Sequence, residues 1–186
     1  MRIAVTGTHG SGKTTLIDDF MDGHRHYEHA QEPYWELAQQ GMPFANGPTT
    51  DHLAEQLEQS ARMILATASE PDVIFDRCPL DFIAYLEVVS EEEDGEDEWT
   101  PSGKLLAKIE AALATLDLIV LLPLSTPDEI TVEIEYPKLR RAVDERLKLI
   151  LREDVLGLLE NGPRVSEISG PRDARLAQLT AAISAG

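Results

Sequence analysis

The sequence predicts an α/β fold in which helices cover both faces of a parallel sheet. Short apolar runs that are typical of strands alternate with longer segments of helical periodicity along the 186 residues. Most strand candidates are short, continuous apolar runs, as at 118–122, which indicates strands buried on both faces. A glycine-rich turn follows the first strand directly, and such sheets bind ligands at the carboxyl ends of their strands.

The first half of the chain is expected to supply three strands, each followed by helical structure. β-Branched and apolar residues predict the strands, and apolar residues at helical spacing predict the helices. Thr49 or Thr50 can cap a long helix that continues through Ser69, and Pro71 breaks this helix. A loop with glycine and proline occupies 41–47. The expected strands are 2–6, 27–30 and 73–75, and the expected helices are 13–21, 33–40, 50–69 and 80–89.

The second half continues the alternation after an acidic segment. Residues 91–98 contain seven acids in eight positions, so we expect a solvated loop over about 90–100. Pro123 closes the fourth strand, and Asn161, Gly162 and Pro163 are expected to end a long helix. The expected strands are 118–122 and 164–168, and the expected helices are 102–116, 138–160 and 173–183.

Composition restricts the class of protein. Lys and Arg number 16 and Asp and Glu number 34, which gives a formal net charge of −18. Such a surface repels nucleic-acid backbones and anionic membranes, so we expect no nucleic-acid or membrane partner. Cys78 is the only cysteine, and no signal peptide or membrane-spanning run is visible. We therefore expect one cytoplasmic domain over 1–186.

The turn after the first strand matches the G-x-x-x-x-G-K-[ST] pattern of a phosphate-binding loop. Its glycines let backbone N–H groups converge on one anion, and the following helix adds its positive end. Lysine in this pattern reaches the β- and γ-phosphates, and the hydroxyl after it binds Mg²⁺. We expect the His9 side chain to be exposed, because backbone amides do the binding. The expected phosphate-binding residues are Gly7, Gly10, Ser11, Gly12, Lys13, Thr14 and Thr15.

Two further observations distinguish among nucleotide-using classes. The chain has only two asparagines, and neither precedes a lysine, so the guanine-reading Asn-Lys-x-Asp signature of switch GTPases is missing. Mechanical ATPases usually have Glu after the aspartate that ends the third strand, whereas Asp76 is followed here by Arg77. Arginine cannot act as a base but can hold a second substrate. The pair favours phosphoryl transfer over hydrolysis, with Asp76 beside Thr14 at the metal.

These features together resemble the nucleoside and nucleotide kinase group of P-loop proteins. They are the loop 7–14, Glu32-Pro33, Asp76-Arg77 and an arginine-rich segment before the last strand. The stretches GTHGSGKTTL and FDRCPLDFIAY resemble more narrowly a bacterial family of small AAA-type ATPase/kinase domains related to the nicotinamide riboside kinase domain. The resemblance implies a three-layer sandwich around a five-stranded parallel sheet of order 2-3-1-4-5, with a helical lid over about 125–155.

The resemblance also implies roles for residues after the second and third strands. Glu32 matches the acid that deprotonates the acceptor hydroxyl in deoxynucleoside kinases, and Arg77 would position the acceptor. Thymidylate-type kinases have Arg before this Glu-Pro pair, where this chain has Gln31. That departure favours a neutral hydroxyl acceptor over a monophosphate. Trp35 is either a stacking surface for the acceptor or part of the core, and Asp81 is interpreted as a charge at a helix N-terminus.

Six of the 16 basic residues lie within positions 138–152. Kinases bring lid arginines onto the transferring phosphoryl group, and Arg140 and Arg141 are the candidates here. Arg146 and Arg152 alternate with acids and are expected to pair along the helix surface. The loop after the last strand lines adenine in nucleotide kinases, which indicates Gly170 and Pro171.

The sequence therefore predicts an ATP- and Mg²⁺-dependent kinase for a small-molecule acceptor. The residues expected to carry catalysis are Lys13, Glu32, Asp76, Arg77, Arg140 and Arg141, with Thr14 and Asp76 at the metal. A regulatory nucleotide-binding protein without such an acceptor is the alternative. A nucleic-acid-dependent ATPase is disfavoured by the charge and by the residue after Asp76.

Overall fold

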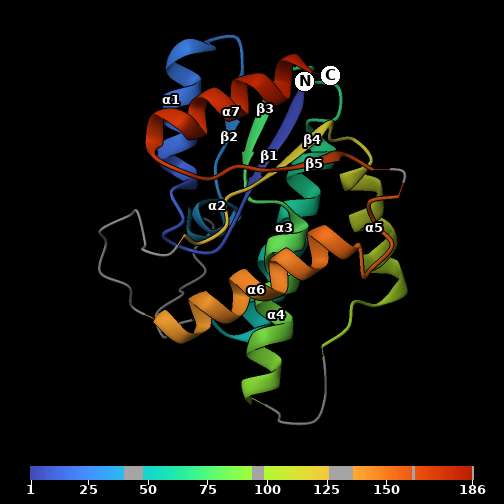
Figure 1. Ribbon diagram of the computed structural model, residues 1–186. Coiled ribbons are helices and arrows are strands. Elements are labelled where there is room, and N and C mark those ends of the chain that lie inside the picture. The colour runs from blue at the N-terminus through green and yellow to red at the C-terminus, as the bar shows by residue number, and fades with distance from the viewer. Residues whose placement is uncertain (40–47, 94–98, 126–135, 161, 186) are drawn as a thin grey trace.

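A computed structural model of the chain describes residues 1–39, 48–93, 99–125, 136–160 and 162–185 (Figure 1). Its centre is a five-stranded sheet in which every neighbouring pair is parallel, in the order β2-β3-β1-β4-β5. The predicted strand order is thus confirmed. The strands are β1 (Arg2–Thr6), β2 (Glu28–Ala30), β3 (Val73–Asp76), β4 (Leu118–Leu121) and β5 (Arg164–Glu167).

Helices cover both faces of the sheet. Figure 1 shows α1 and α7 together on one face and α3, α4, α5 and α6 on the other. No helix within the described ranges is long and apolar enough to cross a bilayer. The helices are α1 (Lys13–Gly23), α2 (Pro33–Gln39), α3 (Thr50–Ala66), α4 (Pro79–Glu93), α5 (Gly103–Leu113), α6 (Pro137–Glu153) and α7 (Arg172–Ser184).

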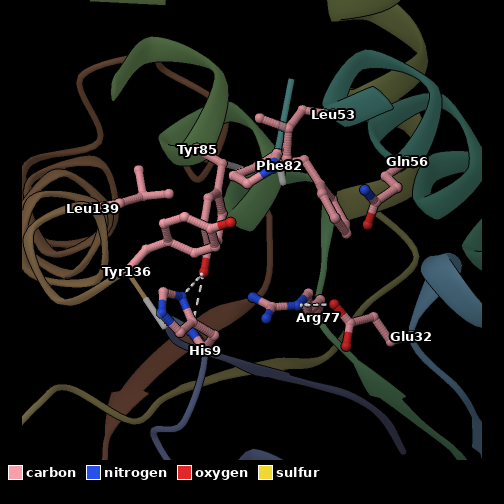
Figure 2. A pocket seen from close by; sticks show the side chains of 10 residues that line it. His9, Glu32, Leu53, Gln56, Arg77, Phe82, Tyr85, Tyr136 and Leu139 are labelled. Atoms are coloured by element: carbon pink, nitrogen blue, oxygen red, sulfur yellow. Dashed lines mark hydrogen bonds and ion pairs between the residues drawn. The ribbon is translucent and has the colours of Figure 1, made fainter. Parts of the chain in front are cut away.

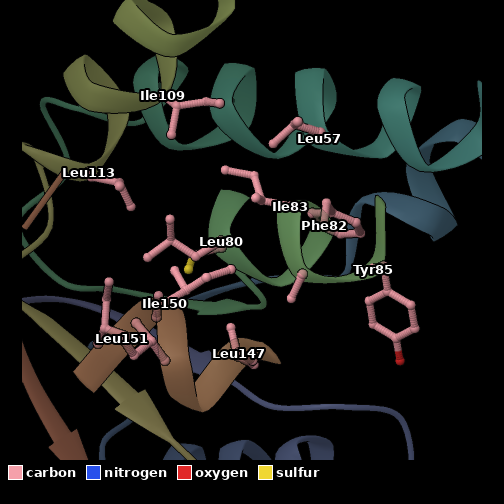
Figure 3. Close-up of a cluster of buried hydrophobic side chains, with 14 of the residues drawn as sticks. Leu57, Leu80, Phe82, Ile83, Tyr85, Ile109, Leu113, Leu147, Ile150 and Leu151 are labelled. Atoms are coloured by element: carbon pink, nitrogen blue, oxygen red, sulfur yellow. The ribbon is translucent and has the colours of Figure 1, made fainter. Parts of the chain in front are cut away.

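Two hydrophobic clusters form because successive strand residues point to opposite faces. Ile3 and Val5 of β1 pack on the side of α1 and α7, whereas Ala4 belongs to the cluster on the other side. In that larger cluster α4 lies between α3 and α6, with Ile83 facing Leu57 and with Leu147 on the other side (Figure 3). Burial on both sides explains why α4 is apolar along most of its length.

The sheet register brings the functional segments together. Val5 of β1 pairs with Asp76 of β3, so both strands end at the same level. The N–H of Arg77 then donates to the carbonyl of Val5 at 3.0 Å and extends the ladder by one residue. The loop after β1 and the turn after β3 are neighbours as a result.

Two predicted boundaries are wrong in the second half of the chain. Helix α6 ends at Glu153 rather than at 160, because Asp154 adopts a left-handed φ of 46°. Its carboxylate accepts the N–H groups of Leu158 and Leu159 and stabilises a turn instead. The acidic segment also does not begin as a loop, since α4 continues through Glu93, and residues 94–98 lie outside the described residues.

Arginines of α6 find partners on other elements, which corrects the expected pairing along the helix surface. Arg146 pairs with Glu87 of α4 at 2.8 Å and with Glu91 at 2.5 Å, and Arg152 pairs with Glu167 of β5 at 2.7 Å. These pairs join α6 to its neighbours. Residues 126–135 of the expected lid, like the loop 41–47, lie outside the described residues.

Arg2 is predicted to stabilise the fold by holding helix ends against β1. Its guanidinium is buried and donates to the carbonyls of Ile64 at 2.7 Å and Glu70 at 3.1 Å, and its Nε donates to the carbonyl of Thr115 at 2.8 Å. Arg2→Met leaves these carbonyls without their donor and should lower the free energy of unfolding by about 2–4 kcal/mol. Urea denaturation measures this.

The matched control for Arg2→Met is Arg25→Met, which removes an exposed arginine that follows α1. Its free energy of unfolding should stay within about 0.5 kcal/mol of the wild-type value. Equal effects of the two substitutions would contradict the role given to Arg2.

Candidate functional site

The loop between β1 and α1 has the backbone conformation of an anion-binding turn. Gly7, Gly10 and Gly12 have positive φ angles of 149°, 65° and 94°. A Cβ at Gly7 would lie 2.6 Å from the carbonyl oxygen of Leu122, so the chain path past β4 requires glycine there. Gly12 is the N-cap of α1, which places the positive end of that helix at the loop.

Side chains from two distant helices hold the carbonyl groups of this loop. Arg140 of α6 donates from Nε to the carbonyl of His9 and from Nη2 to that of Gly10, both at 2.9 Å. Arg175 of α7 donates to the carbonyl of Ser11 at 2.8 Å. The structure therefore places Arg140 at the loop, where its bonds are to the loop backbone, and its contact with a transferring phosphoryl group stays a prediction.

Lys13, Thr14 and Asp76 lie together below the loop. The Lys13 ammonium is buried and donates to the carbonyl of Thr8 at 3.0 Å. Burial, reinforced by the charge of Arg77, lowers the pKa of Lys13 to about 8. Thr14 Oγ1 donates to Asp76 Oδ2 at 3.0 Å.

The second carboxylate oxygen of Asp76 points to a cation site. Asp76 Oδ1 is buried and has no hydrogen-bond partner among the described residues, and burial raises the pKa of this carboxyl. A hydroxyl and a carboxylate side by side are oxygen ligands of the kind that Mg²⁺ prefers. Thr14 and Asp76 therefore fit the metal that the sequence predicts.

Arg77 ties the turn after β3 to Glu32. Its Nε donates to Glu32 Oε1 at 2.5 Å, and its Nη1 donates to the carbonyl of Gly7 at 3.0 Å. Burial alone would raise the pKa of Glu32, but the charges of Arg77 and Lys13 outweigh it and lower the pKa. Glu32 is thus an ionised carboxylate at neutral pH.

Asp81 accepts several buried hydrogen bonds, so it is more than the charge at a helix N-terminus that the sequence predicts. The side chain is fully buried in the first turn of α4. It accepts the N–H of Gly7 at 3.0 Å, the N–H of Cys78 at 2.9 Å and the hydroxyl of Thr6. Asp81 therefore fixes the loop against the turn after β3.

A cavity of about 280 Å³ opens beside the phosphate loop (Figure 2). Figure 2 shows the Arg77–Glu32 pair and His9 along one side, with aromatic and aliphatic side chains opposite. Its volume is near the lower end of small-molecule sites. The lining residues are His9, Glu32, Pro48, Leu53, Gln56, Arg77, Phe82, Tyr85, Tyr136 and Leu139.

His9 is not the exposed side chain that we expected, because Tyr85 of α4 covers it. The Tyr85 hydroxyl lies 2.8 Å from His9 Nδ1 and accepts the His9 N–H at 3.0 Å (Figure 2). It also lies 3.2 Å from the hydroxyl of Thr8. Burial, together with the charges of Arg77 and Arg140, lowers the pKa of His9 to about 4. The imidazole is therefore neutral at pH 7.

The other predicted residues are not among the described residues that line this cavity. Arg141 is exposed on α6, and Thr15 is exposed in the first turn of α1. Gly170 has a φ of 93° in the loop after β5, where Pro171 is the N-cap of α7. Trp35 is 56% exposed and is therefore not part of the core.

Sequence reasoning missed most of the cavity lining, including Gln56 and Tyr85, and it also missed Arg175 at the phosphate loop. Tyr85 lies within a stretch that carries the family resemblance, but nothing in that stretch assigns its hydroxyl to the phosphate loop. Gln56 and Arg175 lie in helices where no motif marks them.

Comparisons with known proteins agree with this architecture. A protein-family model described as "AAA domain" matches residues 2–162, and no curated protein matches the sequence. Deoxyadenosine kinase from M. mycoides with bound dATP is similar over 99% of this chain and 100% of its own, with a TM-score of 0.65 and 14% identity.

Two other solved structures are similar over nearly the whole of this chain. Thymidylate kinase from Candida albicans covers 98% of this chain with 90% of its own, at a TM-score of 0.64 and 16% identity. NadR protein in complex with NR has a TM-score of 0.65 and 19% identity over 98% of this chain, which spans about half of that protein (49%). The chain thus has the α/β fold of nucleotide kinases.

The partly buried, neutral His9 is predicted to make the fold sensitive to acid. Its pKa of about 4 lies below the ordinary value of 6.5, so the unfolded chain binds more protons between these pH values. Stability should therefore fall as pH falls from 6.5 to 4. Between pH 6.5 and pH 4.5 the free energy of unfolding should fall less in His9→Asn than in wild type, by up to about 2 kcal/mol. Urea denaturation at the two pH values measures this difference.

The control for His9→Asn is His26→Asn, which removes an exposed imidazole outside the cavity. This variant should keep the acid sensitivity of wild type. A His9→Asn protein with wild-type acid sensitivity would show that His9 is charged or solvated in the folded state.

Proposed function

The chain belongs to the AAA domain family, and from its site we propose that it is an ATP- and Mg²⁺-dependent kinase that phosphorylates a hydroxyl of a small neutral acceptor. The observation that carries the proposal is the cavity beside the phosphate loop with an ionised Glu32 held at its wall. A hydrolase needs only water there, whereas this cavity has room for a second small molecule.

The nucleotide side of the proposed site uses the loop and the residues below it. The loop amides, the N-terminus of α1 and the Lys13 ammonium would bind the β- and γ-phosphates. Thr14 and Asp76 would hold Mg²⁺, which neutralises charge that develops on the phosphoryl oxygens when it is bound. Gly170 and Pro171 would line the base, and Arg140 and Arg141 would lie near the transferring group. Arg140 already lies at the loop.

Glu32 is proposed as the general base. Among the described residues its hydrogen bond from Arg77 engages Oε1, which leaves Oε2 to accept the proton of an incoming hydroxyl. Arg77 fixes the direction of the carboxylate and keeps it ionised. Arg77 is buried and Glu32 is partly buried, which limits the access of water that would otherwise compete as the acceptor.

The charges around the cavity favour an acceptor without phosphate. Arg77 is the one Lys or Arg in the described lining, and it is already bonded to Glu32 and to the carbonyl of Gly7. The segments 40–47 and 126–135, which lie outside the described residues, contain no Lys or Arg in their sequence. Aromatic rings of Phe82, Tyr85 and Tyr136 favour a ring-bearing acceptor, such as a nucleoside or a cofactor precursor.

An acceptor screen tests the proposal. ADP release with Mg-ATP is followed against nucleosides, nucleoside monophosphates, cofactor precursors and sugar alcohols. Stimulation by a neutral ring-bearing hydroxyl compound supports the proposal. Preference for a monophosphate would overturn the neutral acceptor, and tight nucleotide binding without any transfer would favour the regulatory alternative.

Glu32→Gln is predicted to separate binding from transfer. The amide keeps the size of the side chain but cannot accept the hydroxyl proton, so kcat for transfer should fall by about 10²- to 10⁴-fold. The Kd for Mg-ATP, measured by calorimetry, should change by less than about threefold because Glu32 faces the acceptor cavity.

Glu28→Gln is the matched control, since Glu28 is exposed on β2 and lies outside the cavity. It should leave both kcat and Kd unchanged. Transfer by Glu32→Gln at the wild-type rate would remove Glu32 from the role of base.

A further inference from the structure

Arg175 is a buried cation that the proposed chemistry does not use. It lies in the first turns of α7, and 7% of its surface is exposed. Arginine is rarely buried to this extent unless its guanidinium has partners. The partners of Arg175 therefore indicate why the chain keeps a charge there.

Two of these partners are backbone carbonyls on separate loops. The Nε of Arg175 donates to Gly170 at 2.6 Å, and its Nη1 donates to Ser11 at 2.8 Å. Gly170 lies in the loop after β5, and Ser11 lies in the phosphate loop after β1. Strand β4 separates β1 from β5 in the sheet, so no strand ladder joins these two loops.

The guanidinium can set the distance between the loops because it is planar and its donors are fixed in a fork. A lysine could contact either carbonyl but could not orient both. Gly170 has a left-handed φ of 93°, so this turn does not have the regular strand conformation and needs a partner to fix its carbonyl.

The bond to Ser11 also orients the start of α1. The C=O and N–H of a trans peptide point in opposite directions. When Arg175 holds the Ser11 carbonyl, the N–H of Gly12 is directed to the opposite side. Gly12 is the N-cap of α1, where free N–H groups bind anions. Arg175 thus fixes backbone groups both in the loop after β5 and in the phosphate loop.

We propose that Arg175 is a positioning residue that holds the base loop, residues 169–171, at the distance from the phosphate loop that a bound nucleotide requires. The inference rests on the proposed function, because it takes both loops to contact one nucleotide. Fixing the two loops before binding reduces the ordering cost of the complex. The benefit applies to a ligand that spans both loops and much less to one that fills only the phosphate loop.

The experiment compares a ligand that spans both loops with one that does not. Calorimetry gives Kd values for Mg-ATP and for magnesium tripolyphosphate, and their ratio is the advantage conferred by the nucleoside. Arg175→Met should weaken Mg-ATP by about tenfold or more and tripolyphosphate by about twofold, so the nucleoside advantage falls about fivefold. Arg175→Lys keeps the charge but lacks the fork and should fall between wild type and Arg175→Met.

The control is Arg164→Met. Arg164 on β5 also donates to a carbonyl of α7, that of Ala182 at 3.3 Å, but at the amino end of the strand. The nucleoside advantage of Arg164→Met should equal that of wild type. If Arg175→Met does not fold, as judged by circular dichroism, Arg175→Lys decides the question alone.

An unchanged nucleoside advantage in the Arg175 variants overturns the inference while the proposed function stands. Equal losses of Mg-ATP and tripolyphosphate also overturn it, because Arg175 would then act on the phosphate loop alone. Failure of the wild-type protein to bind Mg-ATP overturns the proposed function and the inference together.

Discussion

The phosphate loop depends on donors for the carbonyl groups that it turns outward. A peptide that presents its N–H to an anion places its carbonyl on the opposite side, and a buried carbonyl needs a partner. Arg140 and Arg175 supply that partner at three consecutive residues, 9–11, and Tyr85 holds the N–H at the tip of the loop. These three side chains come from α6, α7 and α4. The glycine pattern permits the loop path, and the surrounding helices select its orientation.

A second constraint acts at Arg77, which has a left-handed φ of 77°. For a residue other than glycine this conformation costs about 1 kcal/mol or more, so the surroundings must favour it. The turn separates two consecutive side chains, because Asp76 contacts Thr14 while Arg77 contacts Glu32. One dipeptide thereby serves both the metal side and the acceptor side of the proposed site. The buried carboxylate of Asp81 supports this arrangement from below.

The sequence predicted those parts of the site that follow from chain order. Asp76 ends β3 and Glu32 follows the neighbouring parallel strand β2, so their approach could be expected from strand order alone. The contacts of Tyr85 and Arg175 depend on how α4 and α7 rotate against the sheet, which helical periodicity does not specify. The end of α6 was misplaced for a related reason. Asp154 competes with the helix through its side chain, whereas the more obvious breaker signal lies several residues later.

Charge distinguishes the two compartments of the proposed site. The protein carries a net charge of −18, yet Lys13, Arg140 and Arg175 surround the phosphate loop. The bonds that Arg140 and Arg175 make to the loop go to neutral carbonyls, so these bonds leave the positive charge of both side chains in place. In the neighbouring cavity Arg77 faces Glu32, and the two charges balance. A polyanion is therefore attracted to the phosphate loop, and the neighbouring cavity offers it no comparable electrostatic attraction. The same arginine chemistry, with different acceptors, can direct a nucleotide and a neutral acceptor to separate positions.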